Sequence, residues 1–160
     1  MNLLRLKSSI PFSETLNKFI NEFYETHKDT FVIVDNDDFV SPEISFNIHL
    51  QRFRKTGKIH IWNGSSENSI YGNSETNIKF RAWHDYTHMT NELGYTFDDE
   101  SIVAKIQAAF LPIESDKKLL LADVIGQGEY FNNFGEFPID QRRFVATYLT
   151  NRNYAINNKF

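Results

Sequence analysis

The sequence predicts a mainly α-helical (α+β) protein, and three observations support this. Apolar residues recur at helical spacing through most of the chain, and only short segments are typical of β-strands. The second half carries several such helical patterns joined by short connections, which predicts an antiparallel helical bundle. With 160 residues and neither a repeat nor a linker, the chain is expected to form a single domain, 1–160.

The first half combines helices with a small β element. Apolar residues at helical spacing predict a helix over 12–26, and the β-branched run 31–34 predicts a buried strand. Apolar residues over 42–56 fit both the alternation of a strand and the spacing of a helix. Ser41-Pro42-Glu43 at the start and Gly57 after the end favour a helix. A strand over 58–62, followed by a turn, could pair with a short strand at 69–71. We therefore expect a small β-hairpin or a short sheet here, followed by a polar loop over 72–77.

The second half is predicted to contain helices over 78–93, 98–111, 115–134 and 139–152. Gly94 and Gly135 follow two of them and suit a left-handed cap. Pro112 follows another and would end it, because proline cannot continue a helix.

The composition excludes several classes of protein. A chain that is 41% hydrophobic, with 15 Phe, has too much apolar material for a disordered protein. Its formal net charge of -4 lacks the basic footprint of a duplex-binding protein, so nucleic acid is not an expected partner. A basic run is interpreted as a solvated helix end: Arg52, Arg54, Lys55 and Lys58. The absence of cysteine excludes thiol catalysis and cysteine-bound zinc.

No membrane segment is expected. No apolar run approaches the roughly 20 residues that a membrane span requires. The first residues, MNLLRLKSSIPF, lack the apolar run and the cleavage site of a signal peptide. We therefore expect a cytoplasmic protein without a membrane partner, and its many aromatic residues are compatible with a homodimer.

A polar stripe on the predicted 78–93 helix is the main candidate site. Arg81, His84, Asp85 and His88 stand at i, i+3, i+4 and i+7, and Glu92 continues the row. Two histidines at i and i+4 can bind one divalent metal ion from successive turns. Asp85 would be a further ligand or would orient a histidine, and Arg81 would bind a phosphate oxygen.

A second helix offers further ligands. Asp123, Gln127 and Tyr130 recur at i, i+4 and i+7 in an otherwise apolar stripe, where unsatisfied polar groups are costly. Gly126 and Gly128 indicate that another backbone, or a ligand, comes close. If this helix packs against the 78–93 helix, Asp123 joins His84, Asp85 and His88 as a metal ligand. Gln127 and Tyr130 would then join Arg81 in binding the substrate.

The remaining candidates receive structural interpretations. Glu100 is interpreted as a first-turn helix acid and Glu129 as a solvent-facing one. His49 and His60 are interpreted as structural, and His27 as a helix C-terminal residue. The tyrosines are expected to pack in the core: Tyr71, Tyr86, Tyr95 and Tyr130.

The segment His84-Asp85-x-x-His88 resembles the central motif of the HD-domain metal-dependent phosphohydrolases. In that family an upstream histidine, the His-Asp pair and a downstream aspartate hold the metal. The resemblance implies His84 and Asp85 as the pair, Asp123 or Asp140 downstream and His49 upstream. The sequence departs from the family before the motif, where KFRAW replaces an apolar run. Three segments also resemble an uncharacterised group of small bacteriophage proteins, which would place the protein in a host cytoplasm: FRAWHDYTH, ADVIGQGEYF and FPIDQRRF.

Three functions follow from these observations. The first is a metal-dependent hydrolase of a phosphate ester, for which a nucleotide is the expected substrate. The second is a non-catalytic, phage-type binding protein that sequesters a nucleotide or a host partner through the same stripe. The third is a structural or virion-associated protein in which the stripe is a buried polar network between helices.

Overall fold

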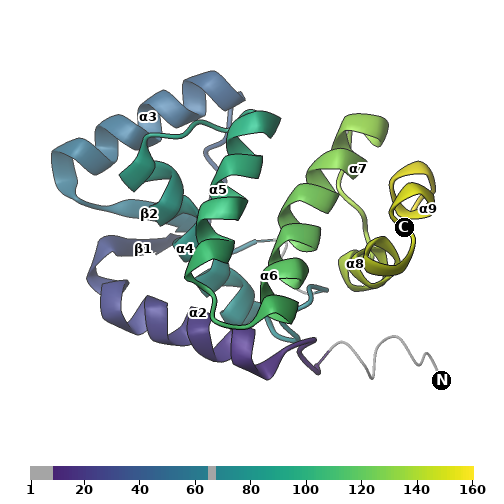
Figure 1. Cartoon of the computed structure of the whole chain (residues 1–160). Coiled ribbons are helices and arrows are strands. Elements are labelled where there is room, and N and C mark those ends of the chain that lie inside the picture. The colour runs from purple at the N-terminus through teal and green to yellow at the C-terminus, as the bar shows by residue number, and fades with distance from the viewer. Residues whose placement is uncertain (1–8, 65–67) are drawn as a thin grey trace.

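A computed structural model describes residues 9–64 and 68–160 and confirms a mainly helical protein with a small sheet (Figure 1). Residues 1–8, which contain most of the segment analysed for a signal peptide, lie outside the described residues. Within the described ranges, no helix has both the length and the apolar character needed to cross a membrane.

The first half forms a β-α-β unit rather than a hairpin. Helix α2 (Glu14–His27) and the 3₁₀ turn η1 (Lys28–Thr30) lead into β1 (Phe31–Val34), and α3 (Pro42–Thr56) connects β1 to β2 (Ile59–Trp62). The two strands pair in parallel, with Phe31 opposite Ile59. The predicted hairpin is wrong because α3 returns the chain to the same end of the sheet, and residues 69–71 form a turn.

The second half contains the four predicted helices with some shifted ends, and a further short helix over 152–157 that the sequence did not predict. They are α4 (Ser74–Asn91), α5 (Phe97–Phe110), α6 (Glu114–Leu121), the π-helical segment η2 (Ala122–Gly126), α7 (Gln127–Phe134), α8 (Gln141–Thr150) and α9 (Arg152–Asn157). The predicted loop over 72–77 is largely helix, because the Asn73 side chain accepts from the Thr76 N–H and caps α4. The left-handed residue that ends α4 is Glu92 (φ 52°), not Gly94.

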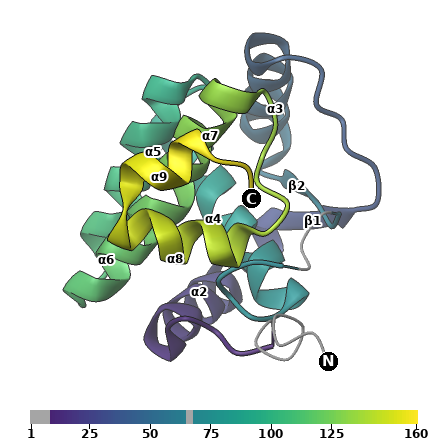
Figure 2. The ribbon, with the colours of Figure 1, turned by 90° about the vertical axis from the view of Figure 1, so that its right-hand side faces the viewer.

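Helix α4 is the central element of the fold. It contacts α2, α3, β2 and α5, so neighbours surround much of its circumference. Its residues join two hydrophobic clusters: Phe80 and Trp83 belong to the larger cluster with α2 and α5–α9, and Ala82 and Met89 to the one around the sheet. The sheet lies on one side of this arrangement and α8 and α9 on the other (Figures 1 and 2).

We expected the segment 115–134 to pack against α4, but it packs chiefly against other helices. Its segments α6 and η2 contact α5, and η2 also contacts α8 (Figure 2). The expected approach of a backbone or a ligand at two glycines is corrected, because aromatic side chains lie there instead. A Cβ atom at Gly126 would lie 3.1 Å from Tyr148, and one at Gly128 would lie 2.9 Å from Phe97.

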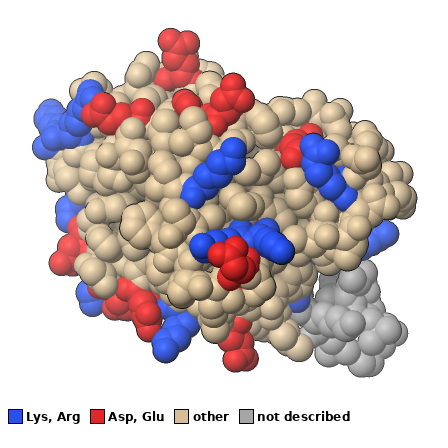
Figure 3. All heavy atoms as spheres, viewed as in Figure 1, with Lys and Arg blue, Asp and Glu red and all other residues tan. Residues whose placement is uncertain are grey.

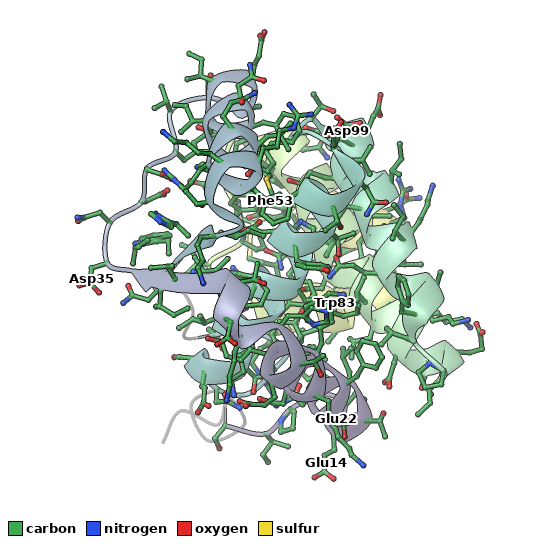
Figure 4. All side chains as sticks on the ribbon, turned by 90° about the vertical axis from the view of Figure 1, so that its left-hand side faces the viewer. Glu14, Glu22, Asp35, Phe53, Trp83 and Asp99 are labelled. Atoms are coloured by element: carbon green, nitrogen blue, oxygen red, sulfur yellow. The ribbon has the colours of Figure 1, made fainter. Side chains whose placement is uncertain are left out.

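The surface carries mixed charge. On the face shown in Figure 3, acidic and basic side chains are interspersed and much of the area is neutral. Figure 4 shows the buried Trp83 inside the fold and the partly buried Phe53 on α3, whereas Glu14, Glu22 and Asp35 lie at the periphery. The face shown in Figure 3 therefore has no broad basic area of the kind that binds duplex phosphates.

Arg142 provides a test of how the C-terminal helices are attached. Its buried guanidinium donates to the carbonyls of Ser69 (2.9 Å) and Ile10 (2.8 Å), connecting α8 to two distant segments. We expect Arg142→Leu to lower the free energy of unfolding by about 2–4 kcal/mol, because it removes two hydrogen bonds from a charged donor, one of which is buried. Urea denaturation measures this. The exposed neighbour Arg143 is the control, and an equal loss in Arg143→Leu would contradict the explanation.

Candidate metal centre

The candidate site lies where α4 turns back into α5. Residues 92–96 reverse the chain, and the Leu93 N–H donates to the His88 carbonyl at the end of α4. Thr96 caps α5 by accepting from the Asp99 N–H. This reversal places the last turns of α4 against the first turns of α5.

Three side chains converge at this reversal. The Nε2 atom of His84 lies 2.7 Å from Oε2 of Glu100 and 3.1 Å from Nε2 of His88. The His88 Nε2 atom lies 3.2 Å from the same Glu100 oxygen. Among the described residues, these are the three whose donor atoms are grouped closely enough to hold a metal ion.

A hydrogen bond at Nδ1 fixes the orientation of each imidazole. The Nδ1–H of His84 donates to Oε1 of Gln107 (2.7 Å), and the Nδ1–H of His88 donates to the Leu93 carbonyl (2.9 Å). Such hydrogen bonds fix the ring orientation and direct Nε2 at the site, as in many metal centres. His88 and Gln107 are fully buried, whereas the side chain of Glu100 is 31% exposed. Solvent therefore reaches the group from the Glu100 side.

The electrostatics couple Glu100 to the histidines. Burial alone would lower the pKa of His84, but the adjacent Glu100 carboxylate outweighs it and raises the pKa to about 9. Burial would raise the pKa of Glu100, but the two histidines hold it well below its usual range. Without a metal, His84 and Glu100 therefore form a partly buried ion pair.

The spacing of the donor atoms suits a metal ion. Three ligands on one face of an octahedron, each about 2.1 Å from the ion, lie roughly 3.0 Å apart, and tetrahedral ligands lie about 3.4 Å apart. The observed separations of 2.7, 3.1 and 3.2 Å are those of hydrogen-bonded groups and lie near both values, so small shifts would bring the three donor atoms around one ion. Two histidines and one carboxylate on a face leave adjacent coordination positions for water and substrate. The donor set is thus chemically suited to a divalent ion such as Fe²⁺, Mn²⁺ or Zn²⁺.

Asp85 and Arg81 do not join this group. Asp85 faces a recess that it shares with His49 and Tyr95, and burial raises the pKa of its carboxyl. The Arg81 guanidinium donates to the Trp62 carbonyl (2.8 Å) and lies over the Trp62 ring. The residues of the expected stripe therefore do not all face one site. Its histidines turn toward α5, and its arginine turns toward the end of β2.

Asp123, Gln127 and Tyr130 also lie outside the group. Asp123 accepts from the Tyr71 hydroxyl (3.0 Å) and from the Gln127 amide (2.7 Å), and burial raises its pKa to about 6. Tyr130 is a core residue that packs against Phe144. Asp123 is held away from the histidines because α5, rather than the 115–134 helix, packs against this part of α4.

The other residues considered from the sequence have identifiable roles. His49 is hydrogen-bonded to Tyr95 (2.6 Å) and Asp38 (2.9 Å), and Asp140 caps α8. His27 ends α2 as predicted. The prediction that Glu129 faces solvent is wrong. Its side chain is 15% exposed and accepts hydrogen bonds from Tyr148 and Arg152.

Sequence reasoning did not assign Glu100 and Gln107 to the site. Glu100 does lie in the first turn of α5, as predicted, but its carboxylate also reaches both histidines. The sequence contains one signal for this contact. His88 and Glu100 are equally distant from Gly94, so the antiparallel reversal brings them opposite each other.

Comparison with protein-family models, with curated proteins and with solved structures finds no match. The geometry of the chain itself must therefore support any functional conclusion. The donor group His84, His88 and Glu100 differs from the ligand set that the HD-domain resemblance implied, because Asp85, Asp123 and His49 lie outside it.

The ion pair predicts a specific pH dependence of stability in metal-free protein. The folded-state pKa of His84 is above its ordinary value of 6.5, so its stabilisation is present below pH 6.5 and is lost as the pH rises through about 9. The folded-state pKa of Glu100 is below its ordinary value of 4.5, so its stabilisation is lost as the pH falls below 4.5. Stability from this pair should therefore peak between these two ordinary values.

Glu100→Gln should remove most of the decrease in unfolding free energy between pH 6.5 and 9, measured by urea denaturation in the presence of a chelator. Glu75→Gln, at an exposed position in the first turn of α4, is the control and should retain the wild-type slope. Parallel pH profiles for wild type and Glu100→Gln would contradict the proposed pairing.

Proposed function

We propose that the protein is a divalent-metal-dependent hydrolase of a phosphate ester, with a nucleotide as the substrate, acting in the cytoplasm. The observation that carries this is the group of three donor atoms from His84, His88 and Glu100, all within 3.2 Å of one another. Catalytic zinc sites use the same donor types, two histidines and one glutamate, and keep a position for water.

Each residue has a defined task in this proposal. His84, His88 and Glu100 hold the ion, which would lower the pKa of a bound water and supply the nucleophile. Gln107 and the Leu93 carbonyl keep both imidazoles in the tautomer that presents Nε2. Because metal binding requires unprotonated Nε2 atoms, the proton on His84 must leave when the ion enters.

The proposed substrate class and the proposed metal ion are supported by different observations. The His84-Asp85-x-x-His88 segment resembles a motif of phosphohydrolases, and an ion with open positions can accept phosphate oxygens. Arg81 is not used in this proposal, since its guanidinium donates to the Trp62 carbonyl at the end of β2.

A second candidate function is structural, and one observation favours it. In metal-free protein, the hydrogen bonds of His84 and His88 to Glu100, Gln107 and Leu93 already form a polar network that connects α4 to α5. Such a network can specify helix packing without a ligand. The two candidates differ in whether a metal ion binds.

Metal content of the purified protein distinguishes them. We expect close to one equivalent of a divalent ion by elemental analysis, and its loss in His84→Ala, because two ligands are too few to hold it. His60→Ala, which removes an exposed histidine, should retain the ion. Protein that contains no metal, and whose melting temperature is unchanged by added Mn²⁺, Ni²⁺ or Zn²⁺, would favour the structural candidate.

Gln107 allows a milder test. Gln107→Leu leaves all three ligands in place but removes the acceptor for the Nδ1–H of His84, so we expect metal affinity to fall about 10–100-fold. Competition with a fluorescent chelator measures this. Gln127→Leu is the matched control, since it removes a glutamine at the start of α7 that donates a hydrogen bond to Asp123. An unchanged affinity in Gln107→Leu would show that the ion does not use His84.

A further inference from the structure

Helix α3 carries apolar residues on two sides, and one of these sides is exposed. Phe46 and Leu50 lie at i and i+4 and pack in the cluster around the sheet. Ile44 and Ile48 lie on the opposite side of the helix, where they are 51% and 47% exposed. The two apolar sides explain why residues over 42–56 also fit the alternation of a strand. A surface helix normally has one apolar side, so the second indicates an interaction surface.

Exposed apolar side chains continue beyond the helix, in the connection from β1 to α3. Phe39 and Val40 directly precede the cap of α3 and are 53% and 67% exposed. The connection is held against the helix, because the Val40 N–H donates to the buried Ser45 hydroxyl (2.8 Å) and Asp38 accepts from Arg52 (3.1 Å). The surface formed in this way is termed the α3 face: Phe39, Val40, Ile44 and Ile48. Helix α3 lies at the edge of the fold, apart from α8 and α9 (Figures 1 and 2).

The α3 face has opposite charges at its two ends. Glu43 lies in the first turn of α3, and Lys55 lies in the last turn. Lys55 follows Ile48 by seven residues and is therefore on the same side of the helix. Over residues 9–64 and 68–160, neither Glu43 nor Lys55 forms an ion pair, whereas Asp38 and Arg52 are paired with each other. One charge of each sign is thus available to a partner.

We infer that the α3 face binds the α3 face of a second copy of this chain, with the two helices antiparallel around a two-fold axis. An antiparallel pair places the first turn of each helix beside the last turn of the other. The apolar centres then meet, and the end that carries Glu43 lies beside the end that carries Lys55. A parallel pair would bring like charges together. The inference does not depend on the proposed hydrolase.

The size of the α3 face predicts a dimer of moderate affinity. Helix α3 has 15 residues, so its exposed side extends about 22 Å. One helix and one connection from each copy form a small contact compared with the interfaces of obligate dimers, which bury more than about 2,000 Å². Because a two-fold contact uses the same surface on both copies, association stops at two. We therefore expect dissociation in the micromolar range.

Sedimentation velocity of the full chain at increasing micromolar concentration tests the inference. We expect the mass to rise towards twice the 18.8 kDa of one chain, with or without a chelator. Ile48→Glu should weaken the dimer about 100-fold, because it places two carboxylates in the apolar centre. Phe110→Glu replaces a side chain on α5 that is 67% exposed, and it is the control that should retain the wild-type affinity. Circular dichroism confirms that each variant is folded.

Charge reversal tests the antiparallel pairing. Lys55→Glu and Glu43→Lys should each weaken the dimer about tenfold, since each variant brings like charges together at both ends of the interface. An equimolar mixture of the two variants should restore association as a mixed dimer, because an acid then meets a base at both ends. Lys105→Glu, at an exposed position on α5, changes the net charge equally and should leave the affinity unchanged.

Three results would overturn the inference. One is a chain that remains a monomer at every concentration, since the α3 face would then be free for a different protein. Another is an equal loss of affinity in Ile48→Glu and Phe110→Glu, which would place the interface elsewhere. The third is a mixture of Lys55→Glu and Glu43→Lys that stays monomeric, which would reject the antiparallel pairing.

Discussion

Helix α4 packs against α2, α3, β2 and α5, and each of its polar groups that these neighbours bury must find a partner inside the protein. This constraint organises the fold. Two imidazoles on one side are satisfied by Glu100, Gln107 and a backbone carbonyl, and the guanidinium of Arg81 is satisfied at the end of β2. Elements far apart in sequence are thereby connected through one helix. The same arrangement that satisfies these groups also collects donor atoms at one point.

A polar cluster that satisfies itself and one that binds a metal use the same residues in two protonation states. With a proton on His84, Glu100 is its counter-ion, and the group needs nothing further. Without that proton, three lone pairs converge and favour a cation. The choice between a structural and a metal-binding role is therefore a competition between a proton and a metal ion for the same nitrogen atoms.

The sequence was informative where short-range physics decides the structure. The cap at Ser41 and the left-handed Gly57 define α3, and the helical spacing places His84 and His88 side by side. It failed where the arrangement of whole elements decides. A short apolar strand does not reveal whether its partner is parallel, and an apolar stripe does not reveal which helix covers it. Asp123 and Gln127 were thus assigned to the histidines, whereas α5 occupies that place and contributes Glu100.

The π-helical segment Ala122–Gly126 has a consequence for the orientation of α7. A π turn holds about one more residue than an α turn, so it changes which side chains the following helix presents to each neighbour. If the same residues formed a continuous α-helix, α7 would be rotated by about 100° about its axis relative to α6. Gly128 would then leave the Phe97 ring, so the contact between α7 and α5 depends on this segment.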